Sequence, residues 1–253
     1  MVIISSEYII ETTDLVKHYN KGQVHAVNGL NLKIKYGEIY AFIGANGTGK
    51  TTALNIISGT LFPTSGKVTV DGYEMPKDRH IISTIMGIAP QEYSIYLDLT
   101  VEENIKFFAN LHLLDKETYT SRMNDMIKVL KLEDKRDTLG KNLSGGMKRR
   151  VSIACSLIHN PKIVLFDEAT VGVDPVLRQW FWNYFRRLRD EGTTILITSH
   201  VMDEAEKADR IGLLRSGVLI DEGTPDQLKE KYNVKTIEEV FLHLSEGVID
   251  DEQ

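Results

Sequence analysis

The chain has 253 residues, of which 42% are hydrophobic and 26% are charged, a balance typical of folded globular proteins rather than disordered chains. Its formal net charge of -6 disfavours a protein whose main task is to bind nucleic acid, because such proteins usually carry a basic surplus. A single cysteine, Cys155, excludes an intrachain disulfide, and we expect a small buried thiol.

Membrane insertion by the chain itself is not expected. No segment approaches the roughly 18 apolar residues that a spanning helix needs. The first ten residues lack a basic leader and already include Glu7, so we expect no secretion signal. These patterns predict a cytoplasmic protein, and any role at a membrane requires a partner that supplies the spanning helices.

The first part of the chain is expected to form β-strands. Residues 9–13, 15–19, 24–34 and 38–43 are rich in strand-forming residues and are separated by turn residues, and residues 66–71 alternate like a half-buried strand.

The middle of the chain is expected to be helical. Thr100 and Glu103 form a predicted capping box, and apolar residues follow at helical spacing. A second amphipathic helix is indicated around residues 123–130. We therefore expect residues 92–160 to form a mostly helical subdomain.

The last part of the chain alternates between strands and helices. Residues 163–166 and 194–198 are continuous apolar runs, typical of parallel strands buried on both faces. Further elements are a helix at 177–189, an edge hairpin at 211–214 and 218–220, a helix starting at Thr224-Pro225 and a helix at 236–244.

Residues 44–51 read GANGTGKT, the pattern G-x-x-x-x-G-K-[ST] of a phosphate-binding loop. A predicted strand precedes the loop and an apolar helical run follows it, as this chemistry requires. Lys50 is expected to reach the β- and γ-phosphates, and Thr51 is expected to offer its hydroxyl to Mg²⁺. The candidate phosphate-chain ligands are Gly44, Ala45, Asn46, Gly47, Thr48, Gly49, Lys50, Thr51 and Thr52.

Two carboxylates follow the apolar run 163–166, in the string IVLFDE. They should lie at the carboxyl end of a parallel strand, where ligands bind in open α/β sheets. Asp167 is expected to hold the Mg²⁺ shell, and Glu168 is expected to polarise the attacking water. No N-K-x-D string follows the loop, so we expect ATP rather than GTP.

Residues 143–147 read LSGGM, which can form a second anion-binding helix start. Ser144 can cap a helix beginning near Met147, and Gly145 and Gly146 allow close approach of main-chain amides. Taken by itself, the string is more typical of an ordinary capped helix. Two anion-binding loops in one chain favour the functional interpretation.

These motifs together resemble the ATP-binding subunits of ATP-binding cassette (ABC) transporters, and the resemblance covers nearly the whole chain. The signature LSGGQ of that family is matched at four of five places, with Met147 in place of Gln. The resemblance implies a phosphate-loop ATPase core of α/β class, with a mostly parallel sheet, an antiparallel N-terminal part and the helical insertion. It also implies that Ser144 contacts the γ-phosphate held by a second ATP-binding subunit, so that two ATP are sandwiched.

The same resemblance assigns four further residues. Gln91 corresponds to the glutamine near the Mg²⁺ and water site, His200 to the switch histidine at the γ-phosphate, Asp174 to an aspartate at the subunit interface, and Tyr19 to the aromatic that stacks on adenine. The segment DEATVGVD departs from the usual DEPT-x-GLD at two apolar positions and keeps the carboxylates.

Within a single ATPase domain we expect a nucleotide-binding core at 1–91 and 161–230, the helical subdomain at 92–160, and a C-terminal helix and tail at 231–253. The implied function is ATP-driven export through a separate membrane permease, by a homodimer or a pair of close relatives, on the cytoplasmic face of the membrane.

A soluble cassette ATPase that remodels ribosomes or DNA is the alternative. A non-hydrolysing regulatory subunit is disfavoured by Lys50, Asp167, Glu168 and His200. We expect the basic run at residues 148–150 to be a solvated helix face.

Overall fold

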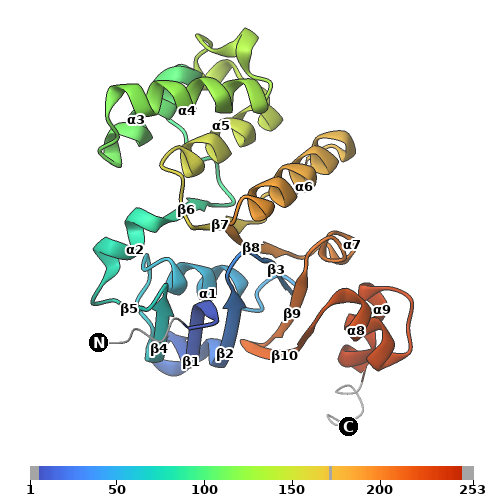
Figure 1. The fold of residues 1–253 in the computed structure, drawn as a ribbon. Helices are drawn as coiled ribbons and strands as arrows, with labels where there is room; N and C mark the ends of the chain where they lie inside the picture. The colour runs from blue at the N-terminus through green and yellow to red at the C-terminus, as the bar shows by residue number, and fades with distance from the viewer. Residues whose placement is uncertain (1–5, 171–172, 247–253) are drawn as a thin grey trace.

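The computed structural model describes residues 6–170 and 173–246 of the chain (Figure 1). The strands are β1 (Tyr8–Tyr19), β2 (Val24–Lys35), β3 (Ile39–Ile43), β4 (Ser65–Val70), β5 (Tyr73–Met75), β6 (Met86–Ala89), β7 (Ile163–Asp167), β8 (Thr194–Ser199), β9 (Arg210–Arg215) and β10 (Val218–Gly223). The helices are α1 (Lys50–Ile57), α2 (Arg79–Ile85), α3 (Val101–Leu111), α4 (Lys116–Val129), α5 (Gly145–Leu157), α6 (Pro175–Asp190), α7 (Met202–Ala205), α8 (Pro225–Tyr232) and α9 (Ile237–Glu246).

Two sheets form the base of the molecule. The strands of the first sheet are antiparallel, in the order β2-β1-β4-β5. The second has the order β10-β9-β3-β8-β7-β6, and its strands are parallel except for β10, which pairs antiparallel with β9. The predicted α/β class, the antiparallel N-terminal part and the edge hairpin are therefore confirmed.

One prediction about the strands is wrong, since residues 9–13 and 15–19 belong to a single strand, β1. The pairing of β1 with β2 shifts register between Thr12 and Leu15, and Asp14 has a φ of 47°. Asp14, which lies between the two predicted strands, is therefore at a bulge, because an inserted residue bends a strand without ending it. The sequence interpretation also missed β5, α2, β6 and α7.

Helix α1 packs between the two sheets. Its residues Leu54 and Ile57 share a buried cluster with Tyr40 and Phe42 of β3 and with Leu30 and other residues of the antiparallel sheet. The alternate residues of β3 point the other way, into a cluster with α6, α7, α8 and α9. The parallel sheet is thus covered on both faces, which explains its uninterrupted apolar runs.

Helices α3, α4 and α5 form a separate group, called here the helical part, which lies at the top of Figure 1. It has its own buried cluster, which includes Val101, Ile127 and Val151. The predicted capping box is confirmed at the start of α3, where Thr100 Oγ1 accepts from the N–H of Glu103 and Glu103 Oε2 accepts from the N–H of Thr100. Three-residue 3-10 turns at Glu133–Lys135 and Gly140–Asn142 join α4 to α5, and another lies at Asn20–Gly22.

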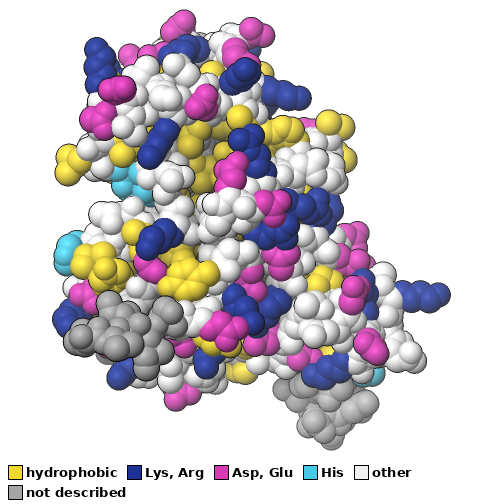
Figure 2. All heavy atoms as spheres, in the orientation of Figure 1, with side chains coloured by type: hydrophobic (Ala, Val, Ile, Leu, Met, Phe, Trp, Pro, Cys, Tyr) yellow, Lys and Arg dark blue, Asp and Glu magenta, His cyan; other side chains and the backbone are white. Residues whose placement is uncertain are grey.

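Acidic and basic side chains are intermingled over the face that Figure 2 shows. Among the described residues, no helix combines the length and apolar character needed to cross a membrane.

Candidate functional site: a phosphate-binding loop facing two carboxylates

The loop at residues 44–49 requires glycine for steric reasons. Gly49 has a φ of 102°, and a Cβ there would lie 1.9 Å from the carbonyl oxygen of Ala26. A Cβ on Gly44 would lie 2.4 Å from the carbonyl oxygen of Leu214. The side chain of Thr48 donates to the carbonyl oxygen of Ala45 at 2.9 Å and stabilises the bend. These contacts give the loop a curled shape that only this glycine pattern permits.

The loop leads directly into α1, whose N-terminal amides have no side-chain cap. Gly49 occupies the capping position and makes no side-chain hydrogen bond there. Amides at an uncapped helix start are available to an anion, and the helix dipole favours negative charge at this end. Residues 44–49 and α1 therefore present main-chain amides of the kind that suit phosphate groups.

Lys50 lies folded against the loop. Its Nζ donates to the carbonyl oxygens of Gly44 and Ala45, at 2.7 and 2.9 Å. Burial lowers the pKa of Lys50 from its ordinary value, and the nearby carboxylates of Glu168 and Asp167 partly oppose this shift. A phosphate group entering the site would offer this ammonium a stronger, charged acceptor than a carbonyl oxygen.

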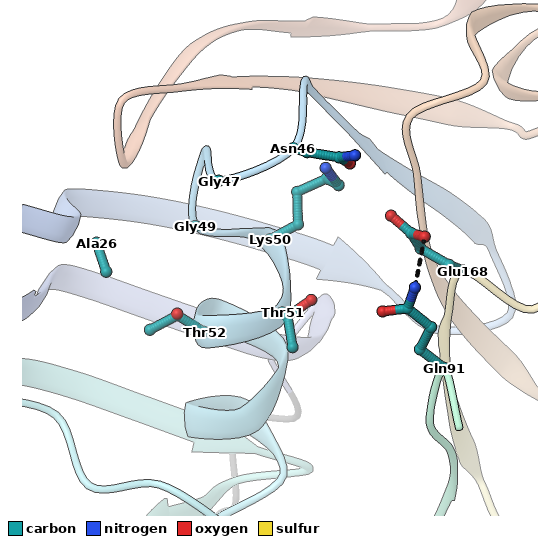
Figure 3. A pocket seen from close by; sticks show the side chains of 9 residues that line it. All are labelled: Ala26, Asn46, Gly47, Gly49, Lys50, Thr51, Thr52, Gln91 and Glu168. Carbon is teal, nitrogen blue, oxygen red and sulfur yellow. Dashed lines mark hydrogen bonds between the residues drawn. The ribbon is translucent and has the colours of Figure 1, made fainter. Parts of the chain in front are cut away.

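The loop and α1 border a hollow of about 340 Å³. Figure 3 shows Lys50, Asn46 and Glu168 directed toward one another across this space. The lining residues are Ala26, Asn46, Gly47, Gly49, Lys50, Thr51, Thr52, Gln91 and Glu168.

Asp167 and Thr51 meet beside the hollow. Thr51 Oγ1 donates to Asp167 Oδ1 at 3.2 Å, and the Thr198 hydroxyl of the neighbouring strand β8 donates to the same carboxylate oxygen. Among the described residues, no group of three or more His, Cys, Asp or Glu side chains could hold a metal. One carboxylate and one hydroxyl nevertheless suit Mg²⁺, which binds to few protein oxygens and completes its shell with phosphate and water.

Glu168 stands at the centre of the site. Its carboxylate accepts from Gln91 Nε2 at 3.2 Å, and it contacts His200 Nδ1 at 3.1 Å. Its N–H donates to both the carbonyl oxygen and the hydroxyl of Thr198, each at 3.1 Å. Gln91, Glu168 and His200, which lie far apart in the sequence, are therefore brought into direct contact.

The LSGGM segment lies away from this hollow. Ser144 Oγ accepts from the N–H of Met147 at 3.3 Å and caps α5, which begins at Gly145 and not near Met147 as expected. Gly145 and Gly146 instead line a second hollow of about 240 Å³. Gln91 and Glu168 line both hollows, so the two spaces are neighbours. Ser144 lines neither of them.

Two other predicted site residues occupy different positions. Asp174 caps α6 by accepting from the N–H of Leu177 at 3.0 Å, and the preceding residues 171–172 lie outside the described residues. Tyr19, at the end of β1, is 38% exposed, and Lys17 Nζ lies 5.3 Å from its ring centroid. Tyr19 does not line the hollow, although Ala26 of the adjoining strand does. The proposed roles of both residues remain predictions.

Sequence reasoning missed two residues that contact the site. Thr198 holds both Asp167 and Glu168 through its hydroxyl. Arg149 is only 4% exposed, so the expectation of a solvated basic face is wrong at this position. The sequence contained a signal for the burial of Arg149. This residue lies one helical turn after Gly145 and must share its face of α5.

Comparisons with known proteins identify the family of this chain. A family model described as ABC transporter matches residues 27–171. The probable multidrug ABC transporter ATP-binding protein YbhF of Escherichia coli is 36% identical over 243 residues, which are 94% of this chain and 42% of YbhF. The Nod factor export ATP-binding protein I of Rhizobium meliloti is 35% identical over 231 residues, which are 90% of this chain and 68% of that protein.

A solved structure of an ATP-binding cassette has a similar fold. The ATP-binding cassette MJ0796, in a dimeric post-hydrolysis state bound to ADP and phosphate, superposes with a TM-score of 0.79 at 27% identity, covering 85% of this chain and 98% of its own. Several curated relatives are much longer than this chain, which spans only 30–42% of their length.

Proposed function

The chain belongs to the ABC transporter family as one of its ATPase cassettes, and we propose that it drives export of a substrate through a separate integral membrane permease. One observation carries the ATPase part of the proposal: the loop and α1 face the carboxylates of Asp167 and Glu168 at the carboxyl ends of parallel strands. Such an edge is where ligands bind in open α/β sheets.

The described side chains suit hydrolysis of a nucleoside triphosphate. Lys50 and the main-chain amides at the start of α1 would bind the β- and γ-phosphates of ATP. Glu168 would accept a hydrogen bond from the attacking water and align it with the γ-phosphorus. The water oxygen then forms a bond to the γ-phosphorus while the bond from that phosphorus to the bridging oxygen breaks, and ADP, phosphate and the proton released by the water result. His200 and Gln91 would hold the Glu168 carboxylate in place, as their contacts at 3.1 and 3.2 Å suggest.

Thr51 and Asp167 are the proposed protein ligands of Mg²⁺, with the side chain of Gln91 nearby in the lining of the hollow. When bound, Mg²⁺ would neutralise charge on the phosphate oxygens. Thr198 would keep the Asp167 carboxylate oriented toward this position through its hydroxyl.

A second ATP-binding subunit, identical or closely related, would complete the site. Ser144 and the glycines of LSGGM do not line the hollow beside Lys50 in their own chain. The solved structure of MJ0796 is dimeric and holds ADP and phosphate, which supports a dimer with bound nucleotide here. We place the start of α5 opposite the nucleotide of the neighbouring subunit. In that arrangement the role of Asp174 would be at the same interface. Two ATP would close the pair, and their hydrolysis would allow it to reopen.

The names of two relatives support export, since one is a probable multidrug transporter subunit and the other exports Nod factor. Both names describe transporter subunits, and we place the translocation path of the present transporter in an integral membrane permease. The chain would then sit on the cytoplasmic face of the membrane through that partner, with no need for nucleic acid.

Glu168→Gln tests the hydrolytic assignment. We expect kcat to fall at least about 100-fold, because a positioned base contributes at least this much, while ATP binding persists and a closed dimer accumulates. ATP turnover, nucleotide affinity and size-exclusion chromatography measure the three results. Glu191→Gln, which changes a surface carboxylate paired with Arg187, is the matched control. Turnover of Glu168→Gln at the parent rate would contradict the assignment.

Purification of the tagged chain from detergent-solubilised membranes tests the transport proposal. A multi-spanning protein should co-purify in a fixed ratio. Recovery of ribosomes or DNA, without any membrane protein, would instead favour the soluble remodelling ATPase.

A further inference from the structure

Arg149 is buried between the LSGGM helix and the hydrolytic site. It belongs to a run of three basic residues at the start of α5, yet only 4% of its surface is exposed. Its two neighbours, Lys148 and Arg150, are both partly exposed. Burying a guanidinium is costly unless its donors are satisfied, so the position of Arg149 calls for a specific role.

The guanidinium of Arg149 donates to three main-chain carbonyl oxygens. Nη1 donates to the carbonyl oxygen of Pro90 at 2.7 Å, and Nη2 donates to those of Gln91 and Glu168 at 3.1 and 3.2 Å. Tyr93 places its ring 5.8 Å from the guanidinium carbon. The first two acceptors follow β6 and the third follows β7, so one side chain links the ends of two adjacent strands.

The link bears on Glu168 because its backbone is strained. Glu168 has a φ of 50°, in the left-handed region that costs a non-glycine residue about 1 kcal/mol or more. Such a conformation persists only when the surroundings hold it on several sides. Thr198 holds the N–H of Glu168, and Arg149 holds its carbonyl oxygen. With both main-chain groups held, the carboxylate is aimed at Gln91 and His200.

We propose that Arg149 is a positioning residue for ATP hydrolysis, which holds Glu168 and the main chain of Gln91 in the geometry that aligns the attacking water. The inference rests on the proposed function of the site. Arginine suits the task because its planar fork can reach several carbonyl oxygens at once, whereas a lysine ammonium acts as a single point charge. Arg149 does not line the hollow beside Lys50, and it would act through Glu168.

Arg149→Met and Arg149→Lys test this role, with Arg150→Met as the matched control. Arg150 lies on the same helix and also donates to main-chain carbonyl oxygens, those of Leu130 and Lys131, but at the helical part. We expect Arg149→Met to lower kcat about 10- to 100-fold, because small misplacements of catalytic groups have effects of this size. The Kd for a fluorescent ATP analogue and the KM should stay within about threefold.

Arg149→Lys should lower kcat less than Arg149→Met does, by about 3- to 10-fold, because a lysine can keep one or two of the hydrogen bonds. Arg150→Met should lower thermal stability and leave kcat within about twofold. If Arg149→Met does not fold, Arg149→Lys decides: a kcat equal to that of the parent overturns the proposal, and a lowered kcat at unchanged Kd supports it.

A double-mutant cycle separates positioning from a general structural effect. If Arg149 acts through Glu168, adding Arg149→Met to Glu168→Gln should lower the single-turnover rate by less than about threefold further. A full additional 10- to 100-fold loss would overturn the proposal, as would a parent-like rate for Arg149→Met alone. If the parent chain itself does not hydrolyse ATP, the proposed function fails and takes this inference with it. If Glu168→Gln stops turnover and Arg149→Met does not lower it, only the inference fails.

Discussion

Two helices of this chain, α1 and α5, begin with glycine-containing motifs, and their starts are built differently. Helix α1 has Gly49 at its capping position and no side-chain cap, and its first residue, Lys50, lines a hollow together with Glu168. Helix α5 is capped by the hydroxyl of Ser144, which is itself exposed. The amides at the start of α1 are therefore available to a ligand in the hollow of the same chain. At the start of α5 one amide is already bonded to Ser144, and this serine is exposed.

The glycines at the two helix starts also differ in backbone conformation and in their neighbours. Gly49 has a positive φ and lies against the main chain of Ala26. Gly146 lacks a positive φ, and a Cβ there would meet only the end of the Leu177 side chain, at 2.9 Å. An added methyl group would therefore collide with main chain before α1, but would meet only a movable side chain at Gly146.

The largest effect should come from adding one methyl group at each start. We expect Gly49→Ala to lower the free energy of unfolding by about 2–4 kcal/mol, because the residue is strained and its Cβ collides with a main-chain oxygen. Gly146→Ala should change it by at most about 1 kcal/mol, since alanine favours the helix and Leu177 can move. Urea unfolding of both variants measures the difference. Similar losses in the two variants would contradict the distinction between the starts.

Loss of charge at the first start should have the next largest effect. Lys50→Met is expected to raise the Kd for ATP about 10- to 100-fold, because a charge-assisted hydrogen bond to phosphate is lost. Isothermal titration of the isolated chain measures this affinity. Lys148→Met is the control, because it removes the same charge beside the second start, and its Kd should equal that of the parent.

The smallest effect should come from Ser144→Ala. Loss of the helix cap should lower the free energy of unfolding by about 1 kcal/mol. The Kd for ATP of the isolated chain should not change, because Ser144 does not line the hollow of its own chain. Turnover at concentrations that support dimers should fall. A changed Kd in the monomer would show that Ser144 acts within its own subunit, and the proposed pairing would need revision.

The motifs around the start of α1 could be predicted from the sequence because they are local. The loop, its flanking strand and helix, and the carboxylates after β7 are encoded in short segments whose spacing carries the chemistry. The capping box at Thr100 was likewise visible, since its two partners are three residues apart. At Asp14 the same local reasoning failed. Aspartate is common in turns, but here it lies at a bulge in a strand that pairs with neighbours on both sides.

Short stretches of the sequence were enough to predict the α/β class, the phosphate-binding loop, the pair of carboxylates and the cap at Ser144. The contacts of Gln91 and His200 with Glu168, and the burial of Arg149, depend on how the chain folds. The physical reason is distance along the chain: Arg149 is separated by 59 residues from Pro90 and by 19 from Glu168. A buried donor is satisfied by whichever acceptors the packed strands bring to it, and no local pattern records which those are.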